Sequence, residues 1–203
     1  MLVITLTKPK PPQITPIWGI NSTSMTEQQP YTVVATEAGF EVRHYPDYVL
    51  AQVKTTGEFN SAANSAFRPL VNYISGRNKT RTQYAMTAPV LHAPNPDSTE
   101  HIISFVLPEG TSIKDLALPV DAEVTLKHVK AHYAAALTFR GLANYEKFNS
   151  LGSQLNAAVQ SAGLNISGDP YYARFDPPWK PGFLRHNEAL IALTGYPQEK
   201  EQK

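Results

Sequence analysis

The chain has 203 residues, of which 42% are hydrophobic, and it contains no cysteine. It can therefore bury a substantial core, but disulfides, thiolate nucleophiles and cysteine-based metal sites are excluded. Its 18 basic and 17 acidic side chains give a formal net charge of +1, which provides no strong field for attracting nucleic acid or an anionic membrane. We therefore expect no nucleic-acid partner.

The two ends of the chain differ in composition from its centre. Residues 1–30 are rich in proline and polar side chains, which predicts an extended or poorly ordered arm. The segment Met1–Lys8 lacks a leading positive charge and a long apolar core, so no signal peptide is expected. No segment reaches the roughly 20 apolar residues of a membrane span. We expect a cytoplasmic protein with a folded domain over 31–196 and a charged tail over 197–203.

The first half of the domain shows strand patterns followed by a helix pattern. Alternating apolar residues, interrupted by turn residues, predict strands at 31–36, 40–45 and 48–55. Apolar residues then recur at helical spacing over 58–75, which predicts an amphipathic helix with Pro69 inside it and Gly76 as a left-handed cap. Two further strands are predicted at 83–90 and 101–107.

The second half repeats this order. Strands are predicted at 123–129 and 131–139, a helix between Gly141 and Gly163, and strands at 170–175 and 188–193. The landmarks of the two halves match: Gly57, helix, Gly76, Tyr84 in the first, and Gly141, helix, Gly163, Tyr172 in the second. The alternative is that any α+β protein of this size shows two helices flanked by hairpins. Duplication predicts two pseudo-twofold halves whose strands curl into a distorted barrel with a ligand groove.

Familiar catalytic signatures are missing. The sequence has no Gly-x-Ser-x-Gly elbow, no His-Glu-x-x-His, no Walker loop and no Gly-x-Gly-x-x-Gly, so an enzyme is not expected. His128 and His132 are four residues apart, but they fall in strands and a turn, which does not favour a metal pair. Met86 could be a soft iron ligand, although an isolated strand methionine is usually core filler.

His44 is the histidine whose position has the clearest chemical meaning. In a regular strand Phe40, Val42 and His44 share one face, while Glu41, Arg43 and Tyr45 share the other. An imidazole beside apolar side chains on the wall of a cleft is what a haem iron needs as an axial ligand. The alternative is that His44 lies half exposed at the strand end and binds nothing.

Several segments, in order along the chain, resemble the SOUL/haem-binding protein family. They are Tyr31–Val34, Phe40–Pro46, Phe67–Asn78, Met86–Val90, Tyr172–Trp179 and Phe183–Glu188. The resemblance implies a pseudo-twofold α+β fold in which a mostly antiparallel, distorted eight-stranded barrel is flanked by two long helices. It also implies similarity to bacterial effector-binding domains that hold drug-like cations in the corresponding groove.

The resemblance further implies binding of haem or other tetrapyrroles. Some members carry an Arg-His-Tyr segment whose histidine is the proposed haem ligand, and here this segment is Arg43-His44-Tyr45. Other members lack the histidine and hold porphyrin by apolar contact. We therefore expect a haem carrier, buffer or scavenger with His44 on the iron and Arg43, Arg77 or Lys79 for the propionates. The alternatives are a binding module for small hydrophobic or cationic molecules and a porphyrin-modifying enzyme; a protein partner is not specified.

Overall fold

A computed structural model of the protein describes residues 26–142 and 144–196. The predicted tail over 197–203 and the first 25 residues of the predicted arm lie outside these ranges. The last residues of that arm are paired: β1 (Glu27–Gln28) runs parallel to β5 (Thr87–Ala88). Strand pairing thus begins before Tyr31. Within the described ranges, neither helix combines the length and the apolar character required to cross a membrane.

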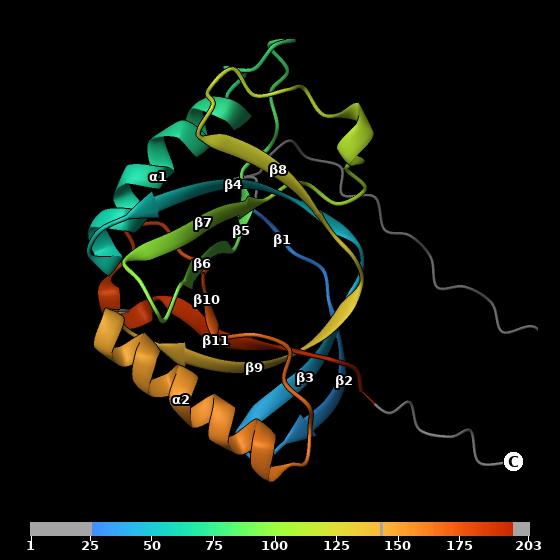
Figure 1. Cartoon of the computed structure of the whole chain (residues 1–203), viewed down its shortest axis with the longest axis vertical. Helices are drawn as coiled ribbons and strands as arrows, with labels where there is room; N and C mark the ends of the chain where they lie inside the picture. Colours follow the sequence, from blue (N-terminus) through green and yellow to red (C-terminus); the bar gives the residue numbers. More distant parts are fainter. Residues whose placement is uncertain (1–25, 143, 197–203) are drawn as a thin grey trace, which may run out of the picture.

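Nine strands form one curled sheet, in which all neighbouring strands are antiparallel (Figure 1). The order across the sheet is β2-β3-β9-β11-β10-β6-β7-β4-β8. The strands are β2 (Thr32–Glu37), β3 (Phe40–Tyr45), β4 (Tyr48–Thr56), β6 (Val90–Pro94), β7 (Glu100–Val106), β8 (Val124–Val129), β9 (His132–Arg140), β10 (Tyr171–Arg174) and β11 (His186–Leu193).

The strand order confirms the predicted pseudo-twofold duplication. Read from opposite directions, the halves are β8-β4-β7-β6 and β3-β9-β11-β10, and they meet at the β6–β10 pair. A helix follows the second strand of each half, α1 (Phe59–Ile74) after β4 and α2 (Tyr145–Ser161) after β9. The ninth strand, β2, lies at the edge outside β3, which accounts for the difference from the eight strands that the family resemblance implies.

Both helices form where the apolar spacing predicts them. In α1 the side chains of Phe59, Ala62, Ala66, Leu70 and Tyr73 recur every three or four residues and are buried. The helix continues through Pro69 and is followed by Gly76 with φ of +96°, the left-handed conformation expected there. In α2 the N-cap Asn144 accepts a hydrogen bond from the Lys147 backbone N–H at 2.9 Å.

The sheet has apolar side chains on both faces. One face packs under the helices: Val42, Leu137 and Ile191 lie in a cluster with α2, and Val53 and Phe105 in a cluster with α1. The opposite, concave face carries a third cluster formed by alternate residues of the same strands (Tyr45, Leu50, Leu91, Val106, Ala134, Ala136, Ala173, Leu190). The concave face is where a groove can form, because α1 and α2 both lie on the other side of the sheet (Figure 1).

The strand predicted at 83–90 is wrong for most of its length. Tyr84 donates its backbone N–H to Ile74 O at 2.8 Å, and its hydroxyl accepts from Ala117 N at 2.8 Å. These bonds hold the segment against the end of α1 instead of against another strand. The strand starts at Val90, and its residue His92 lies opposite Tyr172 of β10. Tyr84 and Tyr172 therefore do not occupy equivalent positions, although the two halves of the fold are equivalent to each other.

Candidate ligand-binding groove

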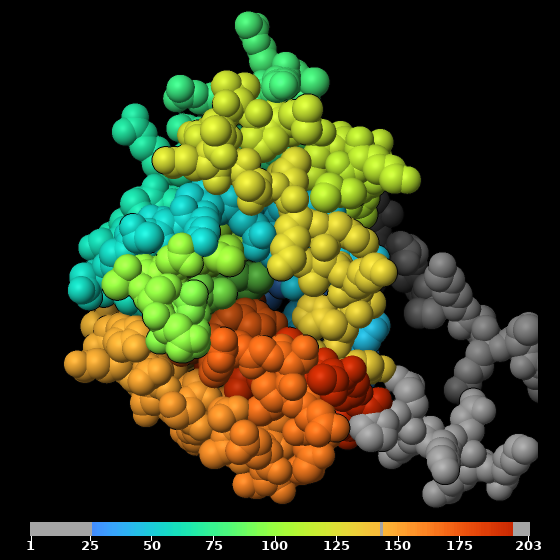
Figure 2. All heavy atoms as spheres, in the orientation of Figure 1, coloured from blue at the N-terminus to red at the C-terminus, as the bar shows by residue number. Residues whose placement is uncertain are grey.

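The mouth of the concave face holds a cavity of about 470 Å³. Its walls include the apolar side chains of Tyr48, Val106, Leu107 and Ile113, and Lys114 and His128 lie among its polar residues. The volume is within the range of small-molecule sites, and mostly apolar walls with a few polar groups are typical of them. In the space-filling view a narrow hollow lies near the centre of the molecule, between its upper and lower parts (Figure 2).

His128 is held at the cavity by a carboxylate. Its Nε2 lies 3.0 Å from Asp47 Oδ2, and both residues line the cavity. The other oxygen of Asp47 accepts a hydrogen bond from the backbone N–H of Ala131 at 2.7 Å. The turn that links β8 to β9 is thus fixed to the start of β4, and the imidazole is oriented by two elements of the sheet.

Beyond the mouth, an inner recess is nearly filled by tyrosine side chains. Its volume is about 10 Å³, about the space that one water molecule needs. The surrounding residues include Tyr31, Tyr45, Tyr48 and Tyr171. Burial raises the pKa of Tyr48 to about 12 and that of Tyr171 well above its ordinary value, so both phenols are neutral at physiological pH. Tyr48 lines both spaces.

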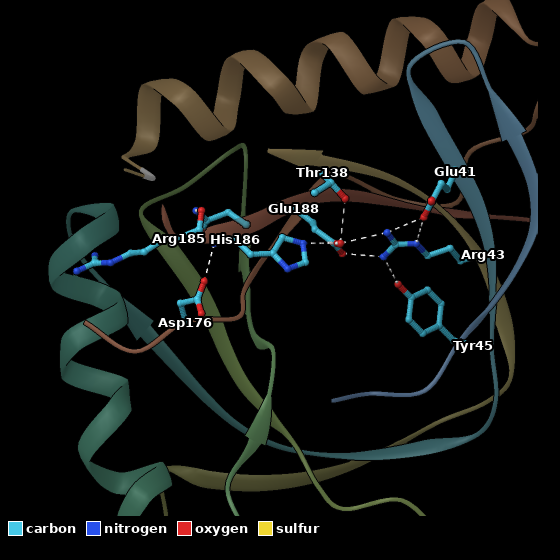
Figure 3. Close-up of polar contacts among 9 residues, drawn as sticks. Glu41, Arg43, Tyr45, Thr138, Asp176, Arg185, His186 and Glu188 are labelled. Carbon is cyan, nitrogen blue, oxygen red and sulfur yellow. Dashed lines mark hydrogen bonds and ion pairs between the residues drawn. The ribbon is translucent and has the colours of Figure 1, made fainter. Parts of the chain in front are cut away.

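A buried ion pair between the two halves of the chain sequence lies beside this recess (Figure 3). Arg43 of β3 and Glu188 of β11 are 2% and 1% exposed. The guanidinium donates from Nη1 to Glu188 Oε2 at 2.8 Å and from Nη2 to Oε1 at 3.1 Å. This two-point contact matches the planar fork of arginine to the carboxylate.

Further hydrogen bonds hold Glu188 in place. Its Oε1 lies 3.0 Å from His186 Nε2 and accepts from the Thr138 hydroxyl at 3.1 Å. Burial alone would raise the pKa of Glu188, but the hydrogen bonds from His186 and Arg43 outweigh it, and the pKa lies below its ordinary value. Glu188 is therefore ionised at neutral pH. The His186 ring stacks on Phe175 with centroids 4.1 Å apart.

The structure does not bring the predicted site residues together. Phe40 and Val42 are buried in the cluster under α2, and the His44 ring lies 5.0 Å from that of Tyr133, which packs against the same cluster. His44 is thus on the helix face of the sheet and lines neither of the two cavities described above. Arg43, on the opposite face, contributes to the concave side.

The other three predicted residues lie far from β3. Arg77 and Lys79 are exposed in the loop that follows α1, at the other end of the molecule in Figure 1. Met86 lies in the irregular segment before β5 and is 38% exposed, so it is neither a strand residue nor core filler. His132, considered with His128 as a metal pair, stacks on Tyr45 at 5.5 Å. Across the described ranges, no group of three or more metal-binding side chains occurs.

Sequence reasoning missed the residues that carry the polar chemistry of the groove. Glu188, His186 and Thr138 are brought to Arg43 by the pairing of β3, β9 and β11. Arg43 and Glu188 are separated by 145 residues. The only available signal was the alternation that put Glu41, Arg43 and Tyr45 on one strand face, combined with the charge of Glu188 in an otherwise apolar strand.

Comparison with known proteins supports this architecture. The C-terminal domain of EcmrR is similar in structure, with a TM-score of 0.58 and 12% identity over 82% of this chain and 99% of that one. EcmrR in an EcmrR–DNA complex, and a hydrolase from Listeria innocua, give TM-scores of 0.59 and 0.53. The EcmrR complex structure is 12% identical, and the match covers 77% of this chain and 57% of that one. The hydrolase is 10% identical, and the match covers 79% of this chain and 94% of that one.

At such low identity these likenesses concern the fold alone. A comparison with curated proteins finds no match. The model of the SOUL heme-binding protein family matches residues 26–192, a range that contains both helices and every strand except the last residue of β11. The chain therefore belongs to the SOUL heme-binding protein family.

Proposed function

We propose that the protein binds haem or a related tetrapyrrole on the concave side of its sheet and acts as a carrier, buffer or scavenger. Family membership supports this class of ligand. The single observation that carries the proposal is the 470 Å³ cavity, whose mostly apolar wall would contact the ring.

The side chains around the cavity fit a tetrapyrrole chemically. Val106, Leu107 and Ile113 offer apolar contact, and Lys114 offers a cation for a propionate. His128 would supply an imidazole nitrogen at the same rim. Bound haem would supply an iron centre and a flat apolar surface; this chain's part is to enclose the ring and neutralise its carboxylates.

Hemin titration of the purified protein tests the proposal. We expect a shifted and sharpened Soret band that saturates near one equivalent. Val106→Lys places a charge in the cavity wall and should weaken binding at least tenfold, whereas Val34→Lys, at an exposed position of the edge strand β2, should leave it unchanged. An unchanged Soret spectrum of added hemin, or equal binding by both variants, would contradict the proposal.

The iron ligand is tested in the same titration. His44 as axial ligand stays a prediction, and its side chain is on the opposite sheet face from the cavity. His44→Ala and His128→Ala are therefore compared by Soret position. If neither substitution changes the spectrum, apolar contact holds the ring, and metal-free porphyrin should bind about as tightly as hemin.

A small organic cation is the second candidate ligand. The observation that favours it is the ionised Glu188, which lies with Tyr31, Tyr45 and Tyr171 around the inner recess. Carboxylates and aromatic faces both attract cations. A thermal-shift panel that compares hemin, metal-free porphyrin and aromatic cations separates the two candidates, because only a bound compound raises the unfolding temperature.

A further inference from the structure

The guanidinium of Arg43 is enclosed on several sides by side chains of other residues. Besides its two bonds to Glu188, it donates from Nε to Glu41 Oε2 at 2.8 Å and from Nη1 to Tyr45 Oη at 3.4 Å. Its Cζ lies 4.1 Å from the centroid of the Tyr31 ring. Two carboxylates and a phenol therefore contact one planar cation (Figure 3), and the face of the Tyr31 ring lies against it.

Two of these groups, Glu188 and Tyr45, have partners other than Arg43. Glu188 is fixed by His186 and Thr138, which come from β11 and β9. Tyr45 is buried, and its ring lies 5.5 Å from that of His132 and 5.5 Å from that of Tyr31. A site whose groups are held by their own neighbours is preorganised and keeps its shape when the occupant changes.

We propose that this cluster is a binding site for a planar organic cation of the guanidinium or amidinium class, and that the chain's own Arg43 occupies it. The inference rests on the proposed function only in taking the concave face as the ligand face. It also decides between the two candidate ligands: with Arg43 paired to Glu188, the inner recess rejects free cations, which argues against the small organic cation. The groove then accepts ligands whose part next to this cluster is neutral or anionic. A tetrapyrrole with propionates is such a ligand.

A second arginine, the half-buried Arg174, shows what distinguishes Arg43. Arg174 Nη1 donates to His92 Nδ1 at 3.3 Å, and its Cζ lies 5.1 Å and 5.3 Å from the ring centroids of Phe59 and Phe148. In the described part of the chain it forms no ion pair with a carboxylate. Removing Arg174 would leave a space lined by neutral groups, whereas removing Arg43 leaves the charge of Glu188 uncompensated. Arg174→Ala is thus the matched control.

The test is chemical rescue of Arg43→Ala, followed by thermal unfolding. Guanidinium chloride is added up to about 50 mM, where its general denaturing effect is small, and is compared with sodium chloride and with urea, its neutral isostere. We expect a saturable rise in unfolding temperature of about 3–6 °C at a tenfold excess over Kd. The rise should require guanidinium and be absent from wild type, from Arg174→Ala and from Arg43→Ala/Glu188→Gln.

An Arg43→Ala protein that responds to guanidinium no more than wild type does would overturn the inference. If this variant does not fold alone, its refolding yield is measured instead. A yield restored by guanidinium and not by urea supports the site, and a yield that guanidinium does not restore refutes it. Hemin titration of wild type is independent of this result. If hemin does not bind, the proposed function is removed but the cation site stands. If hemin binds but guanidinium does not rescue Arg43→Ala, the cation site is removed but the proposed function stands.

Discussion

At the scale of single residues, His92 is the titratable group whose burial has the clearest consequence. It is 0% exposed, its Nε2 lies 3.0 Å from His101 Nδ1, and Arg174 donates to its Nδ1. His101 Nε2 in turn lies 3.0 Å from Gly57 O, which can only accept. The proton positions follow: His101 donates to Gly57, His92 donates to His101, and the His92 imidazole is neutral.

This arrangement makes folding stability depend on pH. Burial, followed by the charges of Arg174 and His101, lowers the pKa of His92 to about 2, against about 6.5 in an unfolded chain. Between these values only the unfolded chain binds the proton. The contribution of the neutral His92 to the free energy of unfolding is therefore complete above about pH 6.5. It is lost as pH falls, and the loss between pH 7 and pH 5 is about 2 kcal/mol.

Urea unfolding at these two pH values measures this loss. His92→Gln cannot take up the proton and should be less stable at pH 7 but lose about 2 kcal/mol less on acidification. His128→Gln, at an exposed position, controls for removal of an imidazole. The lowered pKa values of Asp176 and Glu188 add losses at lower pH that all three proteins share. An equal pH dependence in wild type and His92→Gln would refute the argument.

At the scale of elements, the two helices begin differently. Asn144 caps α2 through its side chain, whereas Glu58 at the N-cap of α1 makes no such hydrogen bond. Asn144→Ala should therefore lower the free energy of unfolding by about 1 kcal/mol, and Glu58→Ala should change it by less than about 0.5 kcal/mol. Urea unfolding of both variants checks the difference; equal losses would mean that the cap bond contributes little.

The elements could largely be predicted from the sequence because their signals are local. The helical spacing gave both helices to within about three residues, and alternation gave most strands. The exceptions are elements fixed by distant partners. Residues 83–86 look like a strand but are held by Ile74 and Ala117, and β1 exists only because Thr87 and Ala88 pair with it. No pattern within such short segments records those partners.

The sequence also showed which residues of β3 share a face, but not which parts of the molecule each face packs against. Phe40 and Val42 are apolar because α2 covers them, and the concave side uses the face with Arg43. In a sheet that buries both faces, apolar character does not distinguish the wall of a groove from the floor beneath a helix. The ion pair with Glu188 depends on the pairing of β3 with β9 and of β9 with β11, strands that lie far apart in the sequence, so it appears only once the strands are paired.

At the scale of the whole molecule, the halves are joined by more than the β6–β10 pair. Phe59, the first residue of α1, belongs to the cluster under α2. Its ring stacks on that of His92 at 3.9 Å and lies 5.8 Å from Phe148 and 6.0 Å from Tyr172. A side chain of the first half thus packs into the core of the second, which should make the two halves unfold together.

Phe59→Ala tests this coupling. Loss of a buried phenylalanine should cost about 3–5 kcal/mol, whereas Phe67→Ala, on the same helix but 43% exposed and packed on Phe105 of its own half, should cost roughly 1 kcal/mol. Because Phe59 contacts both halves, amide hydrogen exchange should show an equal loss of protection in β4 and β7 and in β9 and β11. Loss of protection in β9 and β11 alone would mean that the halves open separately, and that the concave groove can widen without global unfolding.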